Sequence, residues 1–447
     1  MASDRISYQP TDGLSYDPLE ELYWDADALD KEITRVFEVC HGCRMCFKYC
    51  DSFPSLFRYI DDEHDGDVTG LTRVEIADVM ESCFQCKLCE VQCPYTPREK
   101  HEFDLDFPKL VHRWKAQETR KNGLTLRDKI LRNPNATGRM ARASMGMANV
   151  MNRVAAHRWF MEKLIGIHRE KDLPDFASTT FEKWAEGAGM HFGPDGSETV
   201  LFPTCYVENN EPQIGRDTVE VLKANQVSMT CEKGLECCGM PAWERGDLES
   251  VQRQAKVILD KLIPHVEAGS RVVALQPSCG MMLRREYPEL VAKEDRERAA
   301  RLSAAVVAPA EHLWNIRKEE RFNTEVQSKP DGKISYHAPC HTRATGAGFR
   351  ARDVVRKILG AKIGTVMECC GHDGTFAMTV EGFEPSIRAG KRAFEGMNEA
   401  ESEIWMTECS LAAIQFKQHA GKKPLHPMTL LAKAYRGDTF GPKKEGD

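Results

Sequence analysis

The pattern of apolar and polar positions changes character near residue 199. Before this point, apolar residues recur at intervals of three and four, which predicts helices. After it, short apolar runs alternate with helical patterns, which is typical of parallel α/β units. We predict strands at TVLFPT (199–204), RVVALQ (271–276), KISYHA (333–338) and EIWMTE (403–408).

The N-terminal half contains several predicted helices. Apolar spacing predicts a short helix over 28–37 and two more between 51 and 82. Residues 98–170 also show helical periodicity, with breaks near Gly123 and Asn133-Pro134. Mixed signals over 172–198 indicate a linker that leads into the α/β part.

Charge is distributed unevenly along a chain whose formal net charge is -7. Residues 1–39 contain 10 acidic and 3 basic residues, and residues 98–170 contain 16 basic and 8 acidic ones. The acidic arm either packs on the next domain or is a solvated tail, and we leave both open. No reading motif accompanies the basic stretch, so we expect no nucleic-acid partner.

Five methionines lie between Met140 and Met161, interleaved with arginines. A basic, Met-rich amphipathic helix can lie on an anionic membrane surface or bind a partner. We favour the simpler interpretation, an ordinary helix whose flexible methionines pack against neighbours.

The chain contains 17 cysteines and shows neither an export signal nor an apolar run long enough to cross a membrane. In such a chain, cysteines indicate metal ligands rather than disulfides. We therefore expect a reducing, cytoplasmic location. Attachment to the inner face of the membrane would be peripheral, through a partner or an amphipathic surface.

Two cysteine runs near the N-terminus share one spacing. The first is Cys40-x2-Cys43-x2-Cys46-x3-Cys50, and the second is Cys83-x2-Cys86-x2-Cys89-x3-Cys93-Pro94. In bacterial ferredoxins this spacing holds two cubane [4Fe–4S] clusters, and the fourth cysteine of each run ligates the other cluster. Zinc is the alternative, but it usually takes two cysteine pairs, which do not require this spacing. We predict one cluster on Cys40, Cys43, Cys46 and Cys93, and another on Cys83, Cys86, Cys89 and Cys50.

The remaining cysteines follow an internal repeat. The first unit contains Cys205, Cys237-Cys238-Gly239 and Cys279, and the second contains Cys340, Cys369-Cys370-Gly371 and Cys409. The corresponding positions are shifted by 135, 132 and 130 residues. A repeat in which a strand leads into each outer cysteine indicates two related domains.

Each unit is predicted to gather four sulfurs at one crevice, because the carboxyl ends of parallel strands share one edge of a sheet. Adjacent thiolates suit a cluster in which neighbouring irons take one each. Zinc and free buried cysteines are the alternatives. We interpret Cys231 as a buried thiol rather than a replacement ligand. We expect His337, His341 and His372 to form hydrogen bonds around the sulfurs rather than to bind metal.

Both units resemble the cysteine-rich (CCG) domains of heterodisulfide reductase-related proteins, a family that includes one of the subunits of anaerobic glycerol-3-phosphate dehydrogenases. The family's closing Cys-x-x-Cys is interrupted here by Met282 and Ala412. The resemblance is carried by FPTCYVENNEPQIGRDTVEVL (202–222), CCGMP (237–241), PSCGMMLRREYPEL (277–290), HAPCH (337–341) and ECCGHDGTFAM (368–378).

The resemblance implies an iron–sulfur subunit that passes electrons between a flavoprotein dehydrogenase and quinone or another acceptor. It would be an electron carrier rather than a stand-alone catalyst, and we assign no catalytic residue. Two alternatives stay open. One is a disulfide or thiol reductase that uses a noncubane [4Fe–4S] cluster in a CCG domain, and the other is a redox-response partner of a non-haem iron peroxidase.

These observations predict an α+β multidomain protein. The CCG domains would hold one or two further [4Fe–4S] clusters, or zinc, beyond the two cubanes. The predicted parts are an acidic arm (1–39), a helical ferredoxin-like domain (40–100), a helical basic region (101–198), a first CCG domain (199–325) and a second CCG domain (326–447).

Overall fold

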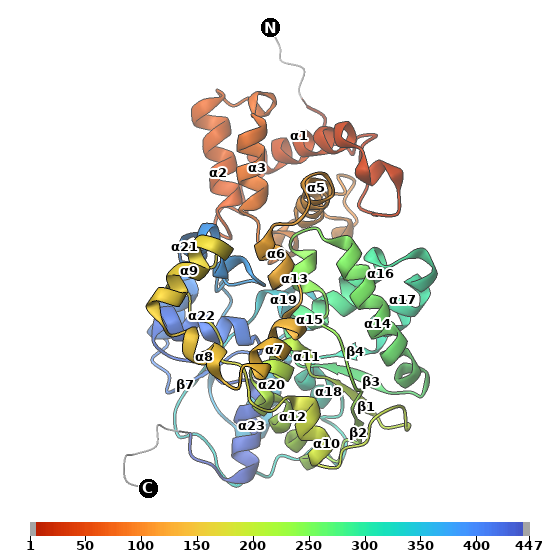
Figure 1. The fold of residues 1–447 in the computed structure, drawn as a ribbon, viewed down its shortest axis with the longest axis vertical. Coiled ribbons are helices and arrows are strands. Elements are labelled where there is room, and N and C mark those ends of the chain that lie inside the picture. The colour runs from red at the N-terminus through yellow and green to blue at the C-terminus, as the bar shows by residue number, and fades with distance from the viewer. Residues whose placement is uncertain (1–5, 441–447) are drawn as a thin grey trace.

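The computed structural model describes residues 6–440, and its helices and strands form one N-terminal helical part and two α/β units. The N-terminal helices lie at one end of the molecule, with the α/β units beneath them (Figure 1). The N-terminal helices are α1 (Ala26–Cys43), α2 (Ser52–Arg58), α3 (Arg73–Glu81), α4 (Leu88–Gln92) and α5 (Phe107–Asn122).

Side-chain caps explain where several of these helices begin. Asp25 accepts a hydrogen bond from the Ala28 amide at 2.7 Å at the start of α1. Thr72 and Glu75 form a capping box at the start of α3. Both arrangements satisfy amide groups that have no partner within the helix.

Helix α1 is longer than the predicted helix over 28–37. It continues through Cys40 to Cys43 and ends at Arg44, whose φ is 54°. The first two cysteines of the N-terminal run therefore lie on a helix rather than in a loop. Their spacing of three residues is compatible with this, because positions i and i+3 share one helix face.

The described part of the acidic arm packs against the helices and is not a solvated tail. The Arg113 guanidinium on α5 donates hydrogen bonds to the carbonyl oxygens of Gly13 at 2.7 Å and Tyr23 at 2.8 Å. The Tyr23 ring is buried. Buried arginines that satisfy backbone carbonyls thus hold the arm in place.

The basic region is helical, and it breaks at the predicted positions. Helix α5 ends at Gly123, and Asn133 caps α7. Its helices are α6 (Leu126–Leu131), α7 (Pro134–Ala143), α8 (Met147–Met151) and α9 (Ala155–Ile165), and α10 (Phe181–Gly187) follows in the linker.

The expectation of one methionine-packed helix over 140–161 is wrong. The chain turns at Met145 and Gly146, whose φ angles are 51° and 91°. The side chains of Met140 and Met145 are 66% and 95% exposed, so they pack little against neighbours. None of the helices in residues 6–440 is long and apolar enough to cross a membrane.

The first α/β unit is built on a parallel sheet of strand order β2-β1-β3-β4. Strand β1 is buried along its whole length, as expected for a sheet covered by helices. The strands are β1 (Thr199–Phe202), β2 (Met229–Thr230), β3 (Arg271–Ala274) and β4 (Val306–Val307). The helices are α11 (Thr204–Asn209), α12 (Pro212–Ala224), α13 (Met240–Trp243), α14 (Leu248–Glu267), α15 (Pro277–Met281), α16 (Tyr287–Leu290), α17 (Arg296–Ala305) and α18 (Pro309–Asn315).

The second unit repeats the central part of this sheet with the strand order β6-β5-β7, again parallel. The strands are β5 (Ile334–His337), β6 (Ile363–Val366) and β7 (Ile404–Met406). The helices are α19 (Cys340–Ala344), α20 (Arg350–Leu359), α21 (Val380–Glu399), α22 (Ser410–Ala420) and α23 (Pro427–Arg436).

The four predicted strands are confirmed as β1, β3, β5 and β7. In each unit, the strand before the first cysteine pairs with the strand before the last one, β1 with β3 and β5 with β7. The two units also share one hydrophobic core, in which Val273 and Leu275 lie with Tyr336 and Met406.

Helix α5 joins the arm to the first unit through a buried histidine. The His112 ring stacks on Trp243 of α13 with a centroid distance of 5.1 Å, and its Nδ1 lies 3.4 Å from the Tyr23 hydroxyl. Burial lowers the pKa of His112 to about 4. The imidazole is therefore neutral in the folded protein at neutral pH.

This burial predicts a loss of stability in mild acid. Between pH 6.5 and 4 the unfolded chain takes up a proton on His112 that the folded chain does not, so the stability present above pH 6.5 decreases as the pH falls. We expect His112 to account for about 1.4 kcal/mol of the stability lost between pH 7.5 and pH 5.5, so the loss in His112→Phe should be smaller than in wild type by about this amount. Thermal unfolding at both pH values measures it, with the exposed His191→Phe as control. Equal pH dependence in wild type and His112→Phe would contradict this prediction.

Candidate functional site

The N-terminal cysteines lie in two groups. Cys40, Cys43, Cys46 and Cys93 line one depression at the surface, together with Met45 and Tyr95. Burial and then the neighbouring Cys93 and Cys43 raise the pKa of Cys46 to about 12. The first group therefore combines three cysteines of the first run with the last cysteine of the second.

The second group, Cys50 with Cys83, Cys86 and Cys89, lies deeper in the protein. Cys83, Cys86 and Cys89 are buried, and Cys50 is half-buried. Burial and then the charges of Cys83 and Cys86 raise the pKa of Cys50. The groups adjoin, because the Cys46 Sγ lies 3.9 Å from the Cys89 carbonyl oxygen. This grouping agrees with the predicted crossed assignment, in which the fourth cysteine of each run joins the other three-cysteine set. That these cysteines bind iron–sulfur clusters stays a prediction.

The first α/β unit brings its four sequence-predicted cysteines together. The Sγ atoms of Cys205 and Cys237 are 3.7 Å apart. Contact with Cys237 and Cys279 and burial raise the pKa of Cys238. Cys205 follows β1, and Cys279 lies in α15 after β3, so both sit at the carboxyl edge of the sheet, where parallel sheets bind ligands.

The second unit forms a similar group that also faces the N-terminal cysteines. Burial raises the pKa of Cys340, and so do the nearby Cys86, Cys370 and Cys409. Cys369 is in hydrogen-bond contact with Cys86. The sulfurs of the second unit thus lie beside the second N-terminal group.

The glycine of the second Cys-Cys-Gly turn has a clear structural reason. Gly371 adopts a φ of 75°, and a Cβ atom at this position would lie 1.9 Å from the Ser386 carbonyl oxygen. Only glycine combines this backbone conformation with so close an approach. The turn can therefore pack directly against α21.

Cys231 lies outside the four groups. Its Sγ is 4.0 Å from the Met190 sulfur. Burial and the charges of three glutamates raise its pKa to about 12. These contacts are those of a buried thiol.

The loop carrying the second N-terminal run is clamped by both α/β units. Toward the first unit, the buried Lys87 ammonium lies 2.5 Å from the Glu286 carboxylate, and Arg285 binds Glu90 at 2.9 and 3.0 Å. Toward the second, the His341 Nε2 lies 3.1 Å from the Gln85 carbonyl oxygen. Buried charge pairs of this kind strongly oppose separation of the loop from the α/β units, because breaking a pair leaves an uncompensated buried charge.

His337 and His341 form hydrogen bonds to oxygen atoms, whereas the Nδ1 of His372 has no partner in the described part of the chain. His337 lies 3.1 Å from the Glu368 carbonyl oxygen and 3.2 Å from the Thr407 hydroxyl. His341 lies 3.0 Å from the Ser278 hydroxyl. Burial lowers the pKa of His372 well below its usual value. Both ring nitrogens of His337 and of His341 thus have polar partners in the protein.

Sequence reasoning missed several charged residues of the site. The buried Lys115 Nζ donates to the Cys83 carbonyl oxygen at 2.7 Å. Glu244 accepts from the Thr375 amide at 2.9 Å, and burial raises its pKa to about 7. Asp373 is buried beside Cys340. Of these residues, only Asp373 could have been noticed in the sequence. Comparison of the two Cys-Cys-Gly motifs shows an added carboxylate at this position, where the first unit has Pro241.

The donor set fits metal centres. All 17 cysteines are free thiols, although pairs such as Cys205 and Cys237 lie close together. Several thiolates in one buried pocket repel one another and lose hydration, which raises their pKa values. A bound cation removes this penalty and favours deprotonation. Sixteen of the cysteines lie in groups with this chemistry.

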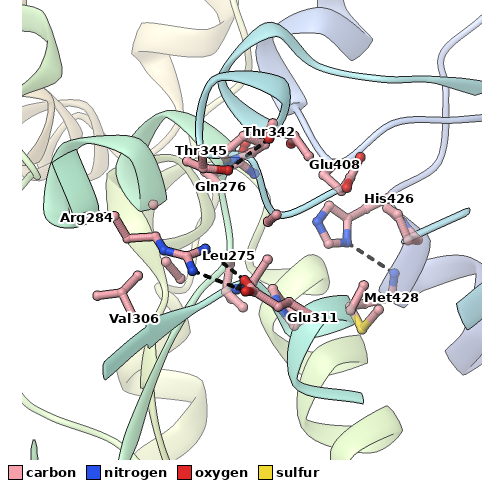
Figure 2. Close-up of a pocket in the computed structure, with 18 residues that line it drawn as sticks. Leu275, Gln276, Arg284, Val306, Glu311, Thr342, Thr345, Glu408, His426 and Met428 are labelled. Atoms are coloured by element: carbon pink, nitrogen blue, oxygen red, sulfur yellow. Dashed lines mark hydrogen bonds and ion pairs between the residues drawn. The ribbon is translucent and has the colours of Figure 1, made fainter. Parts of the chain in front are cut away.

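One cavity lies between the two α/β units, and another adjoins the cysteines of the first unit. A cavity of about 40 Å³ lies between the units, with Glu408 and His426 on one side and the Arg284–Glu311 ion pair on another (Figure 2). It has room only for water-sized molecules. A larger cavity of about 280 Å³ is lined by Cys205, together with polar side chains including Arg142 and Glu208.

Comparisons with known proteins agree with this architecture. The family model described as "Cysteine-rich domain" (CCG) matches residues 199–284 and 334–417. The C subunit of anaerobic glycerol-3-phosphate dehydrogenase from Escherichia coli is 25% identical over 313 residues, 69% of this chain and 77% of the relative. Lactate utilization protein A is 32% identical over 184 residues in Halalkalibacterium halodurans, and 29% identical over 184 residues in Bacillus licheniformis. These matches cover 40% of this chain and 72% and 74% of the relatives.

The fold and the sulfur groups define a protein with two duplicated cysteine-rich domains behind an N-terminal helical part. The chain belongs to the family of cysteine-rich (CCG) domain proteins and carries that domain twice. The resemblance inferred from its motifs is thereby confirmed.

The crossed grouping predicts an unusual response to mutation. Cys50→Ser removes a thiol that lies with Cys83 and Cys86, so we expect the cluster on the second run to be disturbed more than the cluster on the first. EPR of the reduced protein measures both clusters. Cys93→Ser is the matched variant, with the opposite pattern expected. Loss of the first-run cluster in Cys50→Ser, with the other cluster intact, would show that ligation is not crossed.

Proposed function

We propose that the chain is an iron–sulfur electron-transfer subunit that passes electrons between a flavoprotein dehydrogenase and quinone or another acceptor. The observation that carries this proposal is the continuous series of cysteine groups. It runs from the partly exposed first group, through the buried second group, to Cys369 of the second unit. Iron–sulfur clusters bound to these groups would supply one-electron carriers.

The surroundings of the first group support its role as the entry point. Met45 and Phe47 beside it are exposed, with 43% and 56% of their surfaces accessible. Exposed apolar side chains next to a redox centre suit a contact with another protein. Cys83, Cys86 and Cys89 of the second group are buried, which favours entry of electrons through the first group.

Two buried ammonium groups support a carrier role for the second group. Lys115 binds the Cys83 carbonyl oxygen, and Lys87 lies within the cysteine run itself. Positive charge near a cluster favours its reduced form, because reduction adds negative charge. The ion pair between Lys87 and Glu286 moderates this effect.

The partner and the location follow from the relatives and the surface. The name of one relative makes it a subunit of a dehydrogenase, which supports a dehydrogenase partner here. Exposed Met140, Met145 and Leu164 lie in the basic region, which suits peripheral contact with an anionic membrane on the cytoplasmic side. The α/β units would hold further [4Fe–4S] clusters, or zinc.

Anaerobic purification followed by iron and sulfide analysis tests this proposal. About sixteen irons per chain would fill all four groups, whereas about eight would confine clusters to the N-terminal cysteines. We expect Cys46→Ser to slow reduction of the second-group cluster by a photoreduced flavodoxin, but not by dithionite. Fewer than about four irons per chain, or equal slowing with both reductants, would contradict the proposal.

The larger cavity favours a second candidate function, reduction of a small disulfide by the first unit. It opens beside Cys205, and the Thr204 residue before this cysteine has a strained φ of 72°. A small disulfide such as oxidised glutathione would then change the EPR signal of the oxidised first unit. An unchanged signal, with no thiol released under reducing conditions, would exclude this candidate.

A further inference from the structure

The second unit holds a buried carboxylate that no interaction described so far explains. Asp373 is 7% exposed, and its Oδ2 atom has no hydrogen-bond partner among the described residues. The ligand atoms of Cys340, His341 and Asp373 all lie within 4.8 Å of one another. Donor atoms around one metal ion are separated by roughly 3–4 Å, so this spacing is close to that of a metal site.

His341 does not account for this carboxylate. Its Nε2 lies 3.5 Å from the Asp373 Oδ2, which is long for a hydrogen bond. Its two nitrogens have nearer partners, the Ser278 hydroxyl at 3.0 Å and the Gln85 carbonyl oxygen at 3.1 Å. His341 is therefore held by Ser278 and Gln85 and has a positioning role, and it leaves the Asp373 Oδ2 atom without a hydrogen-bond partner within residues 6–440.

The backbone around Asp373 is held in an unfavourable conformation. Asp373 has a φ of 27°, between the left-handed glycines Gly371 and Gly374. The Glu244 carboxylate of the first unit binds the Thr375 amide and hydroxyl at 2.9 and 3.2 Å, which fixes the end of the turn. A strained turn that is held from both units points to a functional side chain.

The internal repeat shows that this arrangement belongs to the second unit alone. With the Cys-Cys-Gly motifs aligned, Asp373 corresponds to Pro241. The residue after the first cysteine is His341 here and Tyr206 in the first unit. The second unit also has Ala412 where its family motif closes with a cysteine. It therefore combines a missing sulfur ligand with an added carboxylate.

We propose that Asp373 is a direct carboxylate ligand of the metal centre of the second unit, bound to the same iron as Cys340. This inference rests on the proposed function and on the iron–sulfur alternative for the second unit, with a centre on Cys340, Cys369, Cys370 and Cys409. A carboxylate oxygen of Asp373 lies within 4.8 Å of the Cys340 sulfur, and Asp373 is buried with the cysteines of this turn. Carboxylate oxygen is a harder ligand than thiolate, so this iron would differ spectroscopically from the all-sulfur irons of the centre.

Mössbauer spectroscopy of protein reconstituted with ⁵⁷Fe tests the ligand directly. We expect one iron of the wild-type second unit to show the higher isomer shift of oxygen ligation. Asp373→Cys should replace the oxygen by sulfur, and Asp373→Asn should leave that iron with Cys340 and cluster sulfide alone, so both variants should lose the higher isomer shift. Asp217→Asn, a buried aspartate paired with Arg436 far along the chain, is the matched control and should retain it.

The outcomes separate this inference from the proposed function. Circular dichroism and the EPR signals of the N-terminal clusters show whether each variant folds, and Asp373→Cys keeps a ligand if Asp373→Asn does not fold. An iron-loaded second unit whose spectra are identical in wild type, Asp373→Asn and Asp373→Cys would overturn the carboxylate ligand alone. An iron content that is unchanged in the Cys340→Ser, Cys370→Ser double variant would show that the second unit holds no iron, which overturns the carboxylate ligand but leaves the electron-transfer role of the N-terminal clusters. Fewer than about four irons per chain would overturn that role as well.

Discussion

The burial of one cysteine loop between the two α/β units is the constraint on which the rest of the structure depends. The loop carries its own charges into the interior, and each is matched by a partner, Lys87 by Glu286 and Glu90 by Arg285. Isolated buried charges are costly, so these pairs define one relative position of the parts. That position brings Cys86 into contact with Cys369 and connects the N-terminal groups to the second unit.

The two α/β units are related by duplication but have diverged in chemistry. In both units an outer cysteine follows a central strand, and the cysteines of a Cys-Cys-Gly turn lie beside this outer cysteine. The first unit has a polar cavity beside Cys205 and no carboxylate in its turn. The second is packed against the N-terminal cysteines and has Asp373 in its turn. The first unit thus has a cavity beside its cysteines, whereas the cysteines of the second unit adjoin the N-terminal cysteines.

Local patterns in the sequence were enough to predict the strands that lead into the outer cysteines and the repeat. They were also enough for helix ends, such as those at Gly123 and Asn133, because caps and breakers act over a few residues. The pairing of Lys87 with Glu286 was beyond prediction, since it joins positions 199 residues apart. The packing of the arm depends on Arg113, whose burial no local pattern reveals. The exposure of Met140 and Met145 likewise follows from tertiary structure, because the periodicity of an apolar helix face is the same whether or not another element covers it.

The buried cysteine loop also has a consequence for how the protein is made. Cys83, Cys86 and Cys89 are covered by both α/β units once the parts have docked. An assembly factor that delivers a preformed cluster needs access to these thiols, and the finished fold does not offer it. On the proposed iron–sulfur assignment, delivery therefore precedes docking, and a cluster on this loop is in place before the parts of the chain come together.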